Sequence, residues 1–359
     1  MKNNGKRLIC ALALLLAFML AAGGCGAKKE EEAPLSVTGV GVIHETEFGG
    51  VYIKLTIDGF NALGFEYGDS VDVVFSGGYA LEDIPYYNGY YVEAGEPLLV
   101  AYPGYEYIKA AVNYGEDLYV TADLDTDSTA DITLKEKGKY LDIQTVSDIH
   151  YKDIREEFPS DEVFANFREV TAGSIGEKTL YRGASPCDNQ HQRAPYSDLL
   201  IGQAGVRCIL DLADSEAKIE KYIASDDFSS PCFLSLYNEG KVIPVALSMN
   251  FTSDSFAASL AEGLILMSQQ EGPYYVHCTE GKDRTGFVCM LLEALAGASW
   301  QEIADDYMIT YDNYYRISPE NEREKYDLIL EKNLLTMVRF LVGDPGADPA
   351  SLDLSGYAR

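Results

Sequence analysis

The stretch from residue 277 to residue 286 constrains this chain most. It reads His-Cys-Thr-Glu-Gly-Lys-Asp-Arg-Thr-Gly, so five residues separate a cysteine from an arginine. A β-prone run, residues 274–276, precedes it, and a strongly helix-forming run, residues 287–295, follows it. The pattern predicts a loop that leaves a strand and enters the N-terminus of a helix.

Such a loop is suited to binding a tetrahedral oxyanion. The first backbone N–H groups of a helix lack intrahelical partners, and the helix dipole favours negative charge there. The same field favours the thiolate form of Cys278. Arg284 can offer a bidentate fork to two phosphate oxygens. Gly281 and Gly286 let the backbone approach a phosphate, and Thr285 can donate its hydroxyl to the thiolate. We therefore expect phosphoryl transfer to Cys278 and hydrolysis of the thiophosphate.

The loop resembles the signature loop of the cysteine-dependent protein-tyrosine phosphatase superfamily. Its Gly-Lys-Asp-Arg-Thr-Gly form is similar to a bacterial branch of tyrosine and dual-specificity phosphatases that also hydrolyse phosphoinositides. The resemblance implies that Cys278 is the nucleophile, Arg284 the phosphate clamp and Asp283 the general acid. Lys282 would add positive charge for multiply phosphorylated substrates. The implied substrate-binding residues are Thr279, Glu280, Gly281, Lys282, Thr285 and Arg182, the last being either a second phosphate contact or a surface-strand arginine.

The sequence offers more than one candidate for the general acid. Tyrosine phosphatases usually place an aspartate on a mobile loop before the cysteine, but residues 236–253 contain Glu239 and no aspartate. Asp254 fits better as the N-cap of the following helix. We therefore prefer Asp283 as the acid, with a structural role in holding the loop as the alternative. We expect His277 to order the loop and support the thiolate.

Four further segments resemble the same bacterial branch. They are Asn166-Phe167-Arg168-Glu169, Leu180-Tyr181-Arg182-Gly183-Ala184, Asp211-Leu212-Ala213-Asp214-Ser215-Glu216 and Ala304-Asp305-Asp306-Tyr307. Ala213 stands where the family usually has an arginine. The resemblance covers roughly residues 160 to 342.

The N-terminus has the features of an export signal. A basic start is followed by an apolar run over residues 8–22, which is too short for a confident membrane span. Ala22-Gly23-Gly24-Cys25 resembles a bacterial lipobox, with Ala22 where leucine is usual. We expect a lipoprotein signal peptide over residues 1–24, lipidation at Cys25, a charged tether over residues 25–35 and a cell-surface location. A plain signal peptide or an uncleaved anchor is the alternative.

The composition limits the partners. A formal net charge of −29 argues against nucleic acid as a partner through a general basic surface. A phosphate site must therefore create its own positive pocket. The cysteine spacings show no zinc pattern, so we expect no metal and no cofactor. Cys278 must be a free thiol, and Cys187 is a minor candidate for a disulfide that shields it.

The remaining chain divides into three parts. Residues 36–145 carry short β-prone runs at roughly ten-residue spacing, residues 117–122 among them, which predict a small all-β barrel or sandwich. Residues 64–91 are faintly similar to the small β-domain of S-adenosylmethionine hydroxide adenosyltransferases, but no activity is implied. The tyrosine cluster at residues 86–91 favours barrel packing over a ligand face.

Residues 146–342 alternate between β-prone and helical runs. They predict an α/β phosphatase domain, with a protein-tyrosine-phosphatase-like sheet flanked by helices. Within it we expect a β-prone run at residues 232–237, a helix capped by Ser299 and another beginning at Ser318. A mobile tail is expected over residues 343–359.

The sequence thus predicts an exported phosphomonoester hydrolase. Its partners would be a phosphorylated protein (phosphotyrosine or dual-specificity), a phosphoinositide or an inositol phosphate, and a membrane through the lipid on Cys25. One alternative is a catalytically silent phosphate-binding lipoprotein, and another is an inositol polyphosphate (phytate) phosphatase. A sulfur-transfer or arsenate-reducing enzyme is a third, although no clear resolving cysteine accompanies Cys278.

Overall fold

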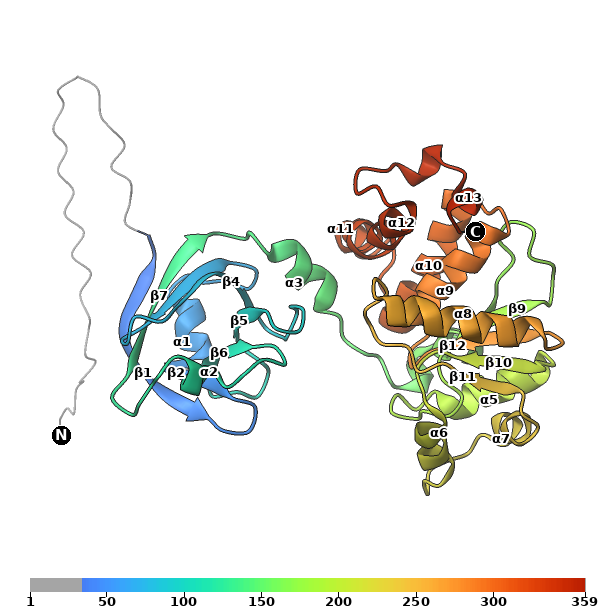
Figure 1. The fold of residues 1–359 in the computed structure, drawn as a ribbon, viewed down its shortest axis with the longest axis horizontal. Coiled ribbons are helices and arrows are strands. Elements are labelled where there is room, and N and C mark those ends of the chain that lie inside the picture. Colours follow the sequence, from blue (N-terminus) through green and yellow to red (C-terminus); the bar gives the residue numbers. More distant parts are fainter. Residues whose placement is uncertain (1–33, 359) are drawn as a thin grey trace, which may run out of the picture.

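The computed structural model describes residues 34–358. Within this range the chain forms a small β-barrel and a larger α/β unit, and the segment joining them carries helix α3 (Leu141–Ser147) (Figure 1). The predicted signal peptide, Cys25 and most of the tether lie outside the described residues. Between residues 34 and 358, no helix has the length and apolar character that crossing a membrane requires.

Seven strands close the barrel in the order β1-β2-β6-β5-β4-β3-β7, and β7 pairs back with β1. All neighbours run antiparallel except the parallel pair β4–β5. The closed ring confirms the predicted all-β part and makes it a barrel rather than a sandwich. The strands are β1 (Ser36–Glu45), β2 (Gly50–Thr56), β3 (Ser70–Phe75), β4 (Ala80–Tyr87), β5 (Pro97–Val100), β6 (Tyr107–Val112) and β7 (Thr129–Glu136), with the short helices α1 (Ile57–Ala62) and α2 (Leu118–Thr121).

A few aromatic side chains pack among the aliphatic residues of the barrel interior. Phe60 and Phe65 stack with ring centroids 4.1 Å apart, and Tyr86 meets Phe60 edge-on. Tyr86 and Tyr87 on β4 are both buried. The start of the tyrosine cluster therefore packs the barrel.

Helix α2 replaces a strand that we expected over residues 117–122. The Asp117 side chain accepts a hydrogen bond from the Val120 backbone N–H and so caps a helical turn. Here the cap overrides the β-propensity of the Leu-Tyr-Val run that follows it.

The α/β unit is built on a five-stranded sheet in the order β11-β10-β12-β9-β8. Strand β12 lies at its centre, and all pairs are parallel except β8–β9. This arrangement agrees with the expected α/β fold. The strands are β8 (Arg168–Glu169), β9 (Leu180–Gly183), β10 (Cys208–Asp211), β11 (Val242–Pro244) and β12 (Tyr274–His277).

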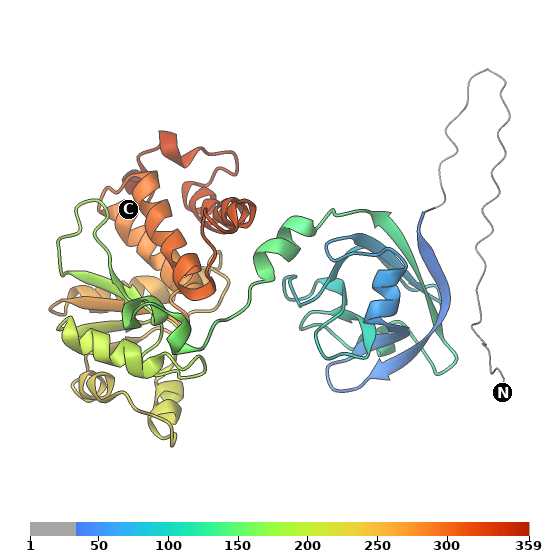
Figure 2. The same cartoon turned by 180° about the vertical axis from the view of Figure 1, so that it is seen from behind.

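Helices cover both faces of this sheet (Figures 1 and 2). One face carries α5 (Ala194–Gln203), α6 (Glu216–Ile223) and α7 (Pro231–Asn238), and the other carries α8 (Asp254–Ser268), α9 (Asp283–Leu295) and α10 (Trp300–Tyr315). Alternate residues of each strand point to opposite faces of the sheet and pack into two separate hydrophobic cores. Val276 of β12 packs in the core that includes Phe287, whereas Tyr275 packs in the core that includes Phe233.

Three local predictions in this unit are wrong. Residues 232–237 form helix α7 because the Asp198 carboxylate accepts the backbone N–H groups of Cys232 and Phe233 and caps the helix from a distance. Helix α8 is capped by Ser253, and Asp254 is its first residue. No helix begins at Ser318, whose side chain joins a turn with Asn321. The capping box predicted at Ser299 is confirmed.

The last helices pack beside α9 and α10. They are α11 (Arg323–Ile329), a π-helical stretch (Leu330–Leu334), α12 (Leu335–Val342), a 3₁₀ turn (Pro349–Ser351) and α13 (Leu354–Ala358); α4 (Asp161–Phe164) and a 3₁₀ turn (Arg155–Glu157) precede the sheet. Helix α13 packs on α9, and Leu354 is only 3% exposed. This packing differs from the mobile tail that the composition predicts.

We expect Leu354→Ala to lower the free energy of unfolding by about 2–5 kcal/mol, because it leaves a cavity in the main core. Tyr357→Ala, at an exposed position on the same helix, is the matched control. Urea titration of the full chain in detergent measures both. Equal, small effects of the two variants would mean that α13 adds nothing to the core.

Candidate active site

The loop between β12 and α9 has the predicted strand–loop–helix geometry. Strand β12 ends at His277, Cys278 follows with 3% exposure, and α9 begins at Asp283. Gly281 has φ +74°, and a Cβ built there would lie 2.3 Å from the Gly183 carbonyl oxygen. Only glycine fits this turn, which folds the loop over the end of β9.

Arg284 and Thr285 lie on the first turn of α9, six and seven residues after Cys278. One guanidinium nitrogen of Arg284, Nη1, donates to the Leu247 carbonyl oxygen at 3.2 Å. Arg284 Nε and Thr285 Oγ1 are buried and have no hydrogen-bond partner among the described residues. Both can therefore donate to an oxyanion without first breaking a hydrogen bond within the protein.

Lys282 is enclosed by two carboxylates of its own loop and by a tyrosine of α10. Its Nζ donates to the Tyr315 hydroxyl at 3.1 Å and lies 3.4 Å from Glu280 Oε2 and 3.6 Å from Asp283 Oδ2. Burial opposes its charge, but Asp283 and Tyr315 raise the pKa of Lys282 well above its usual value. The ammonium group is therefore charged, and the carboxylates of Glu280 and Asp283 offset most of its charge.

Glu280 accepts hydrogen bonds from two tyrosines. The Tyr151 hydroxyl donates to Oε1 at 2.9 Å, and the Tyr315 hydroxyl donates to Oε2. Burial raises the pKa of Glu280, but Lys282 and the two hydroxyls outweigh it and leave the pKa lowered. The carboxylate thus acts as an anchor for the loop, and its charge makes it an unsuitable phosphate contact. Tyr151 ties the segment before the sheet to this loop.

Asp283 is the first residue of α9, with 35% of its side chain exposed. Desolvation of the carboxyl group raises the pKa of Asp283, while Lys282 opposes the shift and Glu280 adds to it. A raised pKa is what a general acid requires near neutral pH.

Arg182 lies beneath the loop. It is 1% exposed, its Nη2 donates to the Gly281 carbonyl oxygen at 2.9 Å, and its Nη1 donates to Asp306 Oδ2. Neither expectation for Arg182 matches this placement, since it is not on the surface and both terminal nitrogens are occupied by protein groups. We interpret it as a positioning residue.

Asp306 on α10 links Arg182 to a second arginine. Arg168 Nε donates to Asp306 Oδ1 at 2.7 Å. Burial alone would raise the pKa of Asp306, but Arg168 and Arg182 hold it far below its usual value. Asn166 extends the network, because its Nδ2 donates to the Glu280 carbonyl oxygen at 3.2 Å.

His277 is fully buried behind the nucleophile. Its Nδ1 lies 3.2 Å from the Cys278 carbonyl oxygen. Burial lowers the pKa of His277 to about 4, so the imidazole is neutral at pH 7. This agrees with an ordering role rather than acid–base chemistry.

A pocket of about 210 Å³ opens beside Asp283 and Arg284. Its apolar lining is Met249, Phe251, Phe256, Phe287 and Met337. Lys332 and Asn333 of the π-helical stretch and Thr336 of α12 complete the lining.

A family model described as the tyrosine phosphatase family matches residues 162–342. The chain belongs to the tyrosine phosphatase family. The matched range contains the whole sheet, the loop and its buried support, so the family assignment and the site concern the same unit.

One curated relative of this tyrosine phosphatase family member is a protein from Nostoc commune named tyrosine-protein phosphatase. The two are 31% identical over 145 residues, which is 35% of this chain and 47% of that protein. The chain therefore spans about half the length of the relative it matches.

Three solved structures are similar at low identity. The core catalytic domain of the PP-IP phosphatase SIW14 from S. cerevisiae, in complex with citrate, has a TM-score of 0.29 and 22% identity, covering 47% of this chain and 85% of that one. TpbA of P. aeruginosa has a TM-score of 0.27 and 14% identity, covering 47% and 94%. An uncharacterized conserved protein from Thermotoga maritima has a TM-score of 0.24 and 19% identity, covering 33% and 43%. Similarities this low carry no weight for function, and the likeness of the barrel to an adenosyltransferase domain stays a prediction.

Sequence reasoning missed the roles of Asp306, Tyr315 and Tyr151. Asp306 lies in a segment that resembles the family, but nothing local to it points to Arg182, which is 124 residues away. The tyrosines carry no motif. A buried arginine in a strand next to an anion loop is the one signal that could have suggested a buried acidic partner.

We expect Asp306→Asn to destabilise the chain by about 3–5 kcal/mol, because it leaves two buried guanidinium groups without their carboxylate. Asp305→Asn, at the exposed neighbouring position, is the control. Chemical unfolding of the full chain in detergent checks both variants. Equal stabilities would show that the network does not hold this part of the structure.

Proposed function

We propose that this chain is a phosphomonoester hydrolase that works through a cysteinyl-phosphate intermediate. The observation that carries the proposal is the loop between β12 and α9, where a buried cysteine precedes a helix N-terminus with an arginine and a threonine on its first turn. Two of their donors, Arg284 Nε and Thr285 Oγ1, are buried without partners. Family membership supports the same chemistry.

In the first step the Cys278 thiolate attacks phosphorus, and the bond from phosphorus to the ester oxygen breaks. Asp283 gives its proton to the leaving oxygen. In the second step water attacks the thiophosphate, the S–P bond breaks and phosphate leaves, with the Asp283 carboxylate taking the proton from that water. Arg284 and the α9 N-terminus stabilise the equatorial oxygens in both steps.

Phosphotyrosine is the substrate class that the surroundings of the loop favour. The neighbouring pocket is lined by aromatic and methionine side chains, which suit an aryl ring. Lys282 is shared between Glu280 and Asp283, so it adds little free positive charge for a polyphosphate. Dual-specificity protein substrates, phosphoinositides and phytate are the competing classes, and a silent phosphate-binding lipoprotein is the competing function.

We also propose that the protein is exported and held at the cell surface by a lipid on Cys25. The support for this is the sequence pattern alone. Phosphorylated substrates would then be extracytoplasmic.

Phosphate release by the full chain, purified in detergent under reducing conditions, tests the activity. The panel is p-nitrophenyl phosphate, a phosphotyrosine peptide, a phosphoserine peptide, phosphoinositide vesicles and phytate. We expect the phosphotyrosine peptide to rank first among the natural classes, and Cys278→Ser to abolish turnover. Cys232→Ser, at a half-buried thiol on α7, is the matched control and should keep wild-type activity. A wild type that is folded and reduced but inert on every substrate would favour the silent binder.

The raised pKa of Asp283 gives a pH prediction. Because the protonated carboxyl donates to the leaving group, kcat/KM for phenyl phosphate should fall as the pH rises through that pKa. Asp283→Asn should remove this alkaline limb and lower the rate by about 10²-fold or more. With p-nitrophenyl phosphate, whose leaving group needs no proton, the loss should be much smaller. An unchanged alkaline limb in the variant would assign the acid elsewhere.

A further inference from the structure

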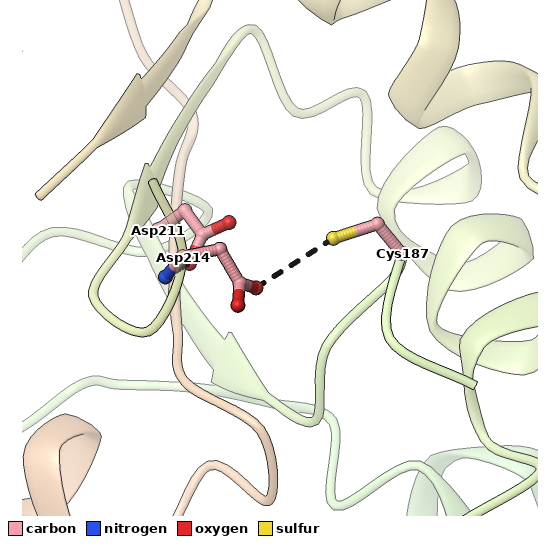
Figure 3. Close-up of side chains that lie close together, drawn as sticks. All are labelled: Cys187, Asp211 and Asp214. Carbon is pink, nitrogen blue, oxygen red and sulfur yellow. Dashed lines mark hydrogen bonds between the residues drawn. The ribbon is translucent and has the colours of Figure 1, made fainter. Parts of the chain in front are cut away.

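A second cluster of reactive side chains lies at the carboxyl end of the sheet, beside the phosphate loop. It consists of Cys187, which follows β9, Asp211, the last residue of β10, and Asp214, which precedes α6 (Figure 3). One ligand atom from each, a thiol sulfur and two carboxylate oxygens, lies within 4.8 Å of the others. The three residues are 3%, 0% and 0% exposed.

The charges in this cluster are poorly compensated. Asp211 Oδ1 accepts the backbone N–H groups of Ala213 and Asp214, but Oδ2 has no hydrogen-bond partner among the described residues. Asp214 Oδ1 is paired with Lys218 Nζ at 2.7 Å, and the Cys187 thiol lies 3.9 Å from Asp214 Oδ2. Two buried carboxylates thus share one cation. Buried carboxylates are normally paired or bound to a metal.

A separate residue points at the same place. His277 Nε2 is fully buried, has no hydrogen-bond partner and lies 3.9 Å from Asp211 Oδ2. Its Nδ1 is within hydrogen-bonding distance of the Cys278 carbonyl oxygen, which can only accept, so Nδ1 carries the proton. Nε2 therefore presents a lone pair toward the Asp211 carboxylate.

We propose that Cys187, Asp211 and Asp214 bind a zinc ion. One thiolate sulfur and two carboxylate oxygens are ligands that Zn²⁺ accepts, and a water molecule can take the fourth position of a tetrahedral site. Binding requires the Cys187 S–H proton to leave to solvent as the S–Zn bond forms. The formal charges then balance, because the thiolate and two carboxylates offset Zn²⁺ and Lys218. Asp211 Oδ2 lies 3.9 Å from His277 Nε2, so the site adjoins the phosphate loop, but the proposal does not depend on the proposed hydrolysis.

This proposal reverses our expectation that the chain holds no metal. The cysteine spacings show no zinc pattern because the ligands come from separate strands of a parallel sheet. Residues 187, 211 and 214 meet only where the chain leaves the carboxyl ends of β9 and β10. A proton shared between Asp211 and Asp214 is the competing way to relieve the buried charge.

Cobalt substitution tests the site. All samples are the full chain in detergent with Cys278→Ser, so that the nucleophile cannot supply a thiolate ligand. After treatment with EDTA and removal of the chelator, Co²⁺ is titrated in and absorbance is recorded. We expect one equivalent of Co²⁺ and a thiolate-to-cobalt charge-transfer band. Zn²⁺ should displace the cobalt and abolish the band, and elemental analysis should then find one equivalent of zinc.

The variants decide whether the ligands are the proposed ones. Cys187→Ser should remove the charge-transfer band, and Asp214→Asn should weaken cobalt binding at least about tenfold. Cys232→Ser, at the half-buried thiol on α7, should leave both unchanged. Near-ultraviolet circular dichroism of each metal-free variant checks folding. The proposal is wrong if the parent binds no metal, as a shared proton predicts, or if the band persists in folded Cys187→Ser.

Discussion

The hydrogen bond from buried Arg182 to the carbonyl oxygen of Gly281 is the contact on which the candidate site depends. Gly281 occupies a left-handed conformation against the end of β9, so its carbonyl points into the protein rather than toward a substrate. A carbonyl aimed at a phosphate would repel it. By holding this oxygen inward, Arg182 leaves the N–H side of the loop for an anion. Asp306 in turn fixes Arg182, and its other carboxylate oxygen accepts a hydrogen bond from Arg168.

The sequence was sufficient for features that depend on neighbouring residues. The strand–loop–helix around Cys278, the capping box at Ser299 and the all-β character of the first part follow from local pattern. The sequence was insufficient where a residue far away in the chain determines the local structure. Helix α7 exists because Asp198 caps it, and that contact spans 34 or more residues. Arg182 was misplaced for the same reason, since its partner lies on a helix that follows the loop.

The positive charge of the site comes from a few neighbouring groups and cannot be inferred from the acidic composition of the whole chain. The chain carries a formal charge of −29, and even its phosphate loop contains two carboxylates. Lys282 and two tyrosine hydroxyls hold the Glu280 carboxylate away from an anion, and desolvation favours the protonated form of Asp283. Arg284 and the helix N-terminus are then the main positive features. A site of this kind distinguishes substrates by their shape and through one well-placed positive charge, rather than by attracting all anions.

The closure of the barrel has a consequence for recognition. Each of its seven strands has a neighbour on both sides, so the barrel has no edge strand that is open along its full length. A partner therefore finds no complete edge to extend, and copies of the barrel have none along which to join. Recognition by the barrel then depends mainly on side chains and loop backbone. A surface of this kind tolerates change in single residues, so its specificity can diverge while the barrel stays the same.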